Sequence, residues 1–343
     1  MSESRFFRFS RWDILNVAVI PLHTAIYLTL AYEYKRLSPV ALVALIPVLF
    51  AMSLQNGGAN HNHYHTPFFR ARWLNVATSM GFSMGGNPKT IYNLAHGLHH
   101  ATVGEWNDAS VLAILGVKRP LHQQLLAYVT FVFESLGAKY LILLILLKRW
   151  PVERLAAFAA PKTPESALHI FKRMQDPAVR RAVMLDVAAW AGFRLVLCLI
   201  DWRFFFFYFL PVTYLIGALR QAENYIQHWG ATDPSDKKRD SVSCYGTLYN
   251  LLTFNLGYHQ EHHLRPAVHW LKLPALTAEL PADRRIVPLI HYVNLPIFYP
   301  EVAAGLAAKR AQGQALMVPE GVAGATGLPN GASSSGPQAP ARS

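Results

Sequence analysis

Long apolar runs constrain this chain most, since a helix of about 20 apolar residues spans the hydrocarbon of a bilayer. Four runs have that character, at residues 14–34, 40–56, 183–200 and 203–223. The short segments KRLSP and DWR separate the members of each pair. The chain is also 52% hydrophobic, which is high for a soluble domain. These features predict an all-α integral membrane protein with two transmembrane helical hairpins.

The basic residues predict how these hairpins are oriented. Lys and Arg in short loops stay on the cytoplasmic side, and two hairpins bring the main basic segments to that one face: 5–11, 70–72, 148–181 and 237–239. This distribution explains the net charge of +12 without a nucleic acid partner. We therefore expect a multi-pass protein of a bacterial inner membrane, with a cytoplasmic cap above the hairpins.

A further apolar run, residues 125–147, carries Glu134 and Lys139 in its middle. A fifth crossing there would put the two histidine motifs described below on opposite sides of the membrane. We therefore expect an interfacial or re-entrant helix at 125–147. The alternative is that this run crosses and 203–223 does not, which leaves the basic 148–181 loop outside.

The two ends differ from the membrane domain, which we place at residues 14–300. The start, MSESRFFRFSRWD, is basic and aromatic and is followed by no small-residue cleavage site, so residues 1–13 are expected to be a retained interfacial segment. The tail at 312–343 is rich in small residues, Pro and Gly, and is expected to be disordered.

The motif HxxHH occurs twice, in YNLAHGLHH and in GYHQEHH. By independent-residue arithmetic about 0.03 occurrences are expected by chance. On a helix, positions i, i+3 and i+4 share one face, so each motif should direct three imidazoles toward a common point. The two motifs supply six histidines: His96, His99, His100, His259, His262 and His263.

Two further clusters follow apolar runs. NHNHYH offers His61 and His65 at i, i+4, whereas His63 faces away and is expected to be a second-layer or surface residue. ENYIQH offers Asn224 and His228 at the same spacing. At the ends of spans, water can solvate these imidazoles until a metal binds. Because one ion accepts at most about six ligands, nine such histidines indicate two metal ions.

Imidazole spacing does not by itself distinguish iron from zinc. Zinc hydrolases usually have three protein ligands and a nearby carboxylate base, whereas this set is saturated with nitrogen, which favours a redox metal. Cys198 and Cys244 form no CxxC motif and are expected to be packing residues.

The order HxxxH, HxxHH, NxxxH, HxxHH resembles the membrane fatty acid desaturase and hydroxylase superfamily of non-haem di-iron enzymes. The likeness covers residues 14–275 and is strongest in AHGLHH and NLGYHQEHHLRPAVHWLKLP. The short first motif, inside HNHYH, is more similar to small bacterial members than to animal acyl-CoA desaturases. The resemblance implies two iron ions, with Asn224 approaching one through water and these ligands: His61, His65, His96, His99, His100, His228, His259, His262 and His263.

The resemblance also implies oxidation of an unactivated C–H bond in a fatty acyl chain or related lipid, with dioxygen as co-substrate. Such chemistry belongs to a cofactor rather than to side-chain acids and bases. Desaturation is the favoured outcome, and hydroxylation and decarboxylation to a 1-alkene remain open because placement of the chain decides among them. The substrate would enter from the bilayer through an apolar tunnel with four candidate lining residues: Phe82, Trp106, Tyr225 and Trp229.

Polar residues near the motifs have several candidate roles. A carboxylate commonly accepts the second N–H of a ligating histidine, and four are close in sequence: Glu105, Asp108, Glu223 and Glu261. A carboxylate or phosphate headgroup could pair with four basic residues, although such residues chiefly set topology: Arg70, Arg72, Lys118 and Arg119. No GxGxxG or Walker motif occurs, so electrons are expected from an external ferredoxin, rubredoxin or cytochrome.

Two other classes use histidine in membranes. A b-type haem protein would pair histidines within its spans rather than beyond their ends. A metal transporter would line its spans with polar residues, and here only His23 and Asp186 are obvious candidates. The isolated histidines are expected to be packing or surface residues: His23, His122, His169, His269 and His291.

Overall fold

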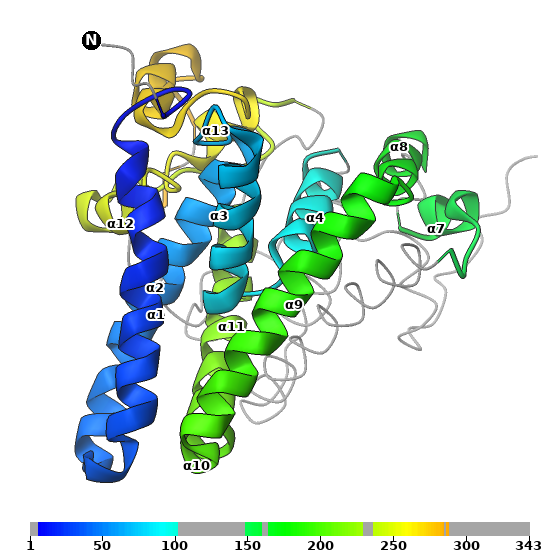
Figure 1. Ribbon diagram of the computed structural model, residues 1–343. Coiled ribbons are helices and arrows are strands. Elements are labelled where there is room, and N and C mark those ends of the chain that lie inside the picture. The colour runs from blue at the N-terminus through cyan, green and yellow to red at the C-terminus, as the bar shows by residue number, and fades with distance from the viewer. Residues whose placement is uncertain (1–5, 102–147, 160–163, 229–235, 285, 288–343) are drawn as a thin grey trace, which may run out of the picture.

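The computed structural model describes residues 6–101, 148–159, 164–228, 236–284 and 286–287 (Figure 1). These residues are predominantly helical and contain no β-strand, although isolated bridges join Phe7 to Phe69 and Ser243 to Ile286. The expected interfacial helix at 125–147 and the tail at 312–343 lie outside the described residues.

The helices fall into a long bundle and a set of shorter elements. The bundle consists of α1 (Asp13–Glu33), α2 (Pro39–His65), α9 (Pro177–Ile200) and a continuous segment made of α10 (Trp202–Phe204), the π-helical η2 (Phe205–Phe209) and α11 (Leu210–Ile226). The shorter elements are η1 (Tyr34–Arg36), α3 (Arg72–Gly85), α4 (Lys89–Ala101), α7 (Val152–Ala159), α8 (Pro164–Met174), α12 (Thr247–Thr253), α13 (His259–Leu264) and η3 (Trp270–Glu279).

Local sequence explains where the long helices begin. The Ser38 hydroxyl accepts the N–H of Ala41 at 3.2 Å, and Pro39 occupies the first turn of α2. Asp201 ends α9 and caps α10, where one carboxylate oxygen accepts the N–H groups of Arg203 and Phe204 at 2.8 and 3.2 Å. The turns predicted from KRLSP and DWR therefore fall between helices.

Three helical segments are long and apolar enough to cross a membrane: Asp13–Arg36, Pro39–His65 and Pro177–Ile200. The fourth predicted span, residues 203–223, is helical, but its apolar part, Trp202–Gly217, is shorter than these three. A fourth crossing, and the cytoplasmic placement of the cap, therefore stay predictions.

The bundle packs around a shared apolar core. One buried cluster joins Tyr27 of α1, Leu49 of α2, Leu197 of α9 and Phe209 of η2. Large apolar side chains also face outward on the same helices, and Val40, Leu199 and Phe207 are 78%, 76% and 67% exposed. A bilayer would cover such a surface, which in water would be an aggregation hazard.

Polar residues inside the spans hold helices together. His23 Nε2 lies 3.1 Å from Gln55 Oε1, which joins α1 to α2. The Asp186 carboxylate of α9 accepts hydrogen bonds from the Ser79 hydroxyl of α3 and from the N–H and hydroxyl of Thr90 of α4. The two polar residues singled out within the predicted spans, His23 and Asp186, thus have hydrogen-bond partners on neighbouring helices.

The beginning of the described chain contacts its far end. Asp13, fully buried, accepts hydrogen bonds from His269 Nε2 at 2.8 Å and from Trp270 Nε1 at 2.9 Å. His269 is therefore a buried packing residue. Of the other isolated histidines, His169 is exposed, and His122 and His291 lie outside the described residues.

The helices cross closely at α2 and α12. A Cβ atom on Gly58 would lie 2.1 Å from the carbonyl oxygen of Thr253. Gly58→Ala must therefore separate the two backbones, and we expect it to lower the free energy of unfolding by about 1–3 kcal/mol. Thermal unfolding of the purified protein in detergent, followed by tryptophan fluorescence, measures the loss.

Gly192→Ala on α9 is the matched control, because a Cβ there meets nothing within 4 Å. We expect that variant to match the parent or exceed it by up to about 1 kcal/mol, since alanine is the better helix former. Equal stability of the two variants would show that the α2–α12 contact does not limit packing.

Candidate metal centre

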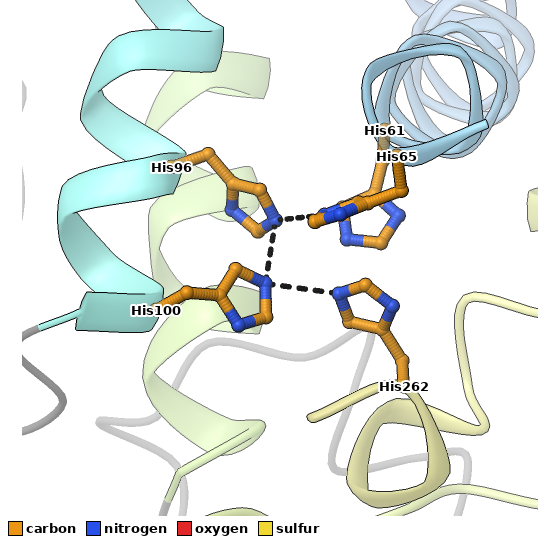
Figure 2. A group of neighbouring side chains, drawn as sticks. All are labelled: His61, His65, His96, His100 and His262. Atoms are coloured by element: carbon orange, nitrogen blue, oxygen red, sulfur yellow. Dashed lines mark hydrogen bonds between the residues drawn. The ribbon is translucent and has the colours of Figure 1, made fainter. Parts of the chain in front are cut away.

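Nine histidines from distant parts of the chain converge into two groups. The five-histidine group comprises His61, His65, His96, His100 and His262, and the four-histidine group comprises His99, His228, His259 and His263. Within each group, one ligand atom from every residue lies within 4.8 Å of the others. Figure 2 shows the five-histidine group, in which α2, α4 and α13 contribute side chains that point toward one another.

Each HxxHH motif divides its histidines between the groups. In α4, His96 and His100 enter the five-histidine group and His99 enters the other. In α13 the division is reversed, because His259 and His263 share a group while His262 joins the first. The expectation that each motif serves one point is therefore wrong. The i, i+4 pair faces one centre, and the i+3 position is rotated enough to face its neighbour.

Distances between ring nitrogens fit metal coordination. In the five-histidine group, the Nε2 atom of His96 lies 3.1 Å from Nε2 of His65 and 3.0 Å from Nε2 of His100. The Nε2 atom of His100 in turn lies 2.9 Å from Nε2 of His262 (Figure 2). In the other group the Nε2 atoms of His228 and His259 are 3.2 Å apart. Nitrogens about 2.1 Å from one ion are about 3.0 Å apart at right angles. The Nε2 atoms are thus spaced as neighbouring ligands of a single ion.

Some of these nitrogens have no other use within the described chain. Both ring nitrogens of His61 and the Nε2 of His263 are buried and have no hydrogen-bond partner among the described residues. An unsatisfied buried polar atom costs about 1–3 kcal/mol. Coordination of a metal would satisfy one nitrogen of each ring, so the residues present fit two metal ions.

Burial favours the neutral form of several of these imidazoles. His61, His259 and His263 are only 3%, 2% and 1% exposed, so the expectation that water solvates these clusters is wrong for most of them. Burial, reinforced by neighbouring imidazoles, holds the pKa of His96, His259 and His263 well below the usual value. Neutral imidazole is the form that binds metals.

Asp240 orients two members of the four-histidine group. Its carboxylate accepts the Nδ1–H of His263 at 3.1 Å, and its backbone carbonyl accepts the Nδ1–H of His228 at 2.9 Å. Both contacts leave the Nε2 lone pairs for a metal. Sequence reasoning missed Asp240, because it lies in the loop segment KKRDSVS with no regular spacing to the histidines.

Asp240 also connects the centre to the surface. Lys237 Nζ donates to Asp240 Oδ2 at 3.1 Å and to the backbone carbonyl of His100 at 3.2 Å. The Ser241 hydroxyl donates to Asp240 Oδ1 at 3.0 Å. One loop therefore contacts residues of both histidine groups.

The carboxylates chosen from sequence have other partners. Glu261 accepts hydrogen bonds from the hydroxyls of Ser243, Tyr245 and Thr277, which anchor α13. Glu223 accepts from Arg220 and the Tyr249 hydroxyl. These contacts do not support a role for either glutamate as a histidine partner, so that role stays a prediction. Glu105 and Asp108 lie outside the described residues.

The remaining predicted residues are only partly placed. Phe82 is 1% exposed and packs with Val19 and Phe68, so its tunnel role stays a prediction. Trp106 and Trp229 lie outside the described residues, and the side chains of Asn224 and Tyr225 are not described.

His63 belongs to neither group. It is 5% exposed rather than a surface residue, and its Nε2 lies 3.2 Å from Asn75 Oδ1. The prediction from the i+2 spacing, that His63 faces away from His61 and His65, agrees with its absence from both groups.

Comparison with known proteins agrees with this geometry. The sequence profile of the family described as fatty acid desaturase matches residues 37–306, which include all nine histidines. The chain belongs to the fatty acid desaturase family. The family is one of oxidoreductases, and the resemblance seen in the histidine motifs is confirmed.

A curated relative gives a narrower match. A sphingolipid delta(4)-desaturase of Candida albicans is 38% identical over 86 residues, which cover 20% of this chain. The chain spans only 23% of the length of that relative. No solved structure matches.

The substitution Asp240→Asn tests whether Asp240 orients the histidines of this desaturase for metal binding. The change keeps the side-chain shape but removes the charge beside His263, so we expect metal affinity to fall about 10- to 100-fold. Competition with a chromophoric chelator measures that affinity. Asp283→Asn is the control, since Asp283 is exposed and pairs only with Arg239 among the described residues. Equal metal retention in both variants would contradict the assignment.

Proposed function

We propose that this protein is a membrane lipid desaturase that removes two hydrogens from an acyl chain, using two bound irons, dioxygen and an external electron donor. The observation that carries the proposal is the convergence of nine histidines, most of them buried, into two adjacent groups. Family membership supports the reaction class. We propose the nine histidines as the iron ligands, with His263 and His228 oriented by Asp240.

The protein's own contribution is position and exclusion of water. When bound, the iron pair would supply the oxidising chemistry that side chains lack. The rigid i, i+4 pairs of α2, α4 and α13 fix the ligand nitrogens before a metal arrives. The Tyr92 ring stacks on His96 with centroids 5.6 Å apart and an interplanar angle of 7°, which covers one side of the five-histidine group. A dry, preformed site favours oxidation of the substrate over loss of oxidant to water.

The membrane setting follows from the same helices. We propose that the apolar segment α10–α11 completes a fourth crossing, so that both hairpins end at the histidine groups on the cytoplasmic side of a bacterial inner membrane. The basic cytoplasmic loops would attract an acidic ferredoxin, rubredoxin or cytochrome. Because one relative is named as a sphingolipid delta(4)-desaturase, we propose sphingolipids as candidate substrates in addition to fatty acyl chains.

Product analysis tests the reaction. We expect expression in a host of simple lipid composition to add a new internal double bond to its fatty acids or long-chain bases, detected by gas chromatography and mass spectrometry. Oxygenated chains would identify a hydroxylase, and shortened hydrocarbons a decarboxylase. Unchanged lipids and hydrocarbons, with an electron donor co-expressed, would contradict the proposal.

Metal content tests the centre itself. We expect close to two irons per chain, falling to about one in His262→Ala or His99→Ala, because each change removes a ligand from a different group. Both variants should lose product while still inserting into membranes. His169→Ala is the control, since His169 is exposed on α8. Stoichiometric zinc in place of iron, or full turnover in either ligand variant, would refute the assignment.

A further inference from the structure

A cavity with several polar and charged residues in its lining lies beside the metal centre. This cavity, of about 220 Å³, opens between the end of α2 and helices α3, α4 and α9. The lining residues that carry the argument are Tyr64, Arg72, Asn75, Lys89, Asn93 and Asp186. None of them belongs to the two histidine groups.

Lys89 is the unusual member of this lining. Its side chain is only 1% exposed, and its Nζ donates to the backbone carbonyl of Asn60 at 2.8 Å and to Asn93 Oδ1 at 3.2 Å. Within the described part of the chain, no carboxylate oxygen lies within 4.0 Å of the Lys89 Nζ, the distance limit for an ion pair. An ammonium carries three N–H donors, so one remains for another acceptor. A buried charge normally requires a partner.

Asp186 is not that partner. Its carboxylate is occupied by the Ser79 hydroxyl at 3.0 Å and by the N–H and hydroxyl of Thr90 at 2.7 and 2.6 Å. Burial lowers the pKa of Lys89 to about 7, and the nearby charge of Asp186 opposes that shift only in part. A bound anion would restore the charged ammonium.

Other residues extend the site toward solvent and toward the metal centre. Arg72 is exposed and supplies a second positive charge to the lining. On the inner side, the Tyr64 ring lies 4.5 Å from the ring of His65 and 5.7 Å from that of His96. A group held in the cavity would therefore be separated from the five-histidine group by about one side chain.

We propose that this cavity binds the anionic end group of the lipid substrate, a carboxylate or a phosphate, through Lys89 and Arg72. The inference rests on the proposed function and narrows it: the substrate is an anionic lipid rather than a neutral ester. The cavity is large enough for such a head but not for a long chain, which would extend away from it. Asn93, whose Oδ1 accepts from Lys89 Nζ, places an amide nitrogen beside the charge. The Asn75 amide, in contrast, is already bonded to the backbone of Phe69 and Ala71.

Binding measurements test the site independently of turnover. We would measure equilibrium binding of tritiated palmitate to the iron-loaded protein in nanodiscs, with methyl palmitate and hexadecyl phosphate as competitors. We expect the methyl ester to compete about tenfold or more weakly than palmitate, because it lacks the charge. Stronger competition by hexadecyl phosphate would support the site and identify phosphate as its ligand. Equal competition by the neutral ester would overturn the inference.

Variants separate anion binding from a structural role of Lys89. We expect Lys89→Met to weaken palmitate binding about tenfold or more, whereas Lys89→Arg keeps the charge and retains most of it. Both should still hold close to two irons and bind methyl palmitate as the parent does. Lys272→Met, at an exposed lysine, is the control. Loss of iron or of ester binding in Lys89→Met would show that Lys89 merely ties α4 to α2, and would overturn the inference.

The two proposals fail in different ways. If lipids stay unoxidised in cells while palmitate binding still depends on Lys89, the proposed reaction is wrong and the anion site stands. If oxidised lipid forms and binding does not depend on Lys89 or on charge, the anion site is wrong and the reaction stands.

Discussion

Crowding of neutral imidazoles around two points is the constraint on which the rest of the structure depends. Ring nitrogens 2.9–3.2 Å apart cannot all be satisfied by hydrogen bonds to one another, since each such contact uses one proton and one lone pair. Other features serve to hold this arrangement. Helix phase sets the i, i+4 pairs, Asp240 fixes two tautomers, and Glu261 anchors α13 from behind through three hydroxyl groups.

Buried carboxylates elsewhere in the structure also have hydrogen-bond partners that join separate segments. Asp186 binds α3 and α4, and Asp13 holds His269 and Trp270. Close contacts complete the packing, because Gly97 lies where a Cβ would meet the Tyr64 hydroxyl at 2.7 Å. Lys89 differs from these residues, since it lines a cavity and its ammonium is held by neutral oxygens of Asn60 and Asn93 rather than by a carboxylate of the described residues. That difference is the reason we propose a binding role for Lys89 and a packing role for the others.

Sequence predicted the parts of this molecule that depend on local spacing. Hydropathy located the long helices and their turns, and the HxxHH, HxxxH and NxxxH spacings together selected the nine histidines that converge. It did not predict how each motif divides, because that depends on the angle at which α4 and α13 approach each other. Asp240 was missed for a related reason: its contact with His263 comes from a loop whose path is set by tertiary packing. The sequence likewise did not predict the burial of the imidazoles, since their polar neighbours in the sequence suggested exposure to water.

The contact between Asp13 and His269 has a consequence for assembly. These residues are 256 positions apart, so the first helix waits for almost the whole domain to be synthesised before its buried carboxylate finds a partner. Each histidine group also needs α13, which emerges late from the ribosome. The five-histidine group can therefore be complete only once His262 has been synthesised, and the four-histidine group only once His263 has been. Binding of the proposed metals to a full set of ligands would come only after all the long helices have been synthesised.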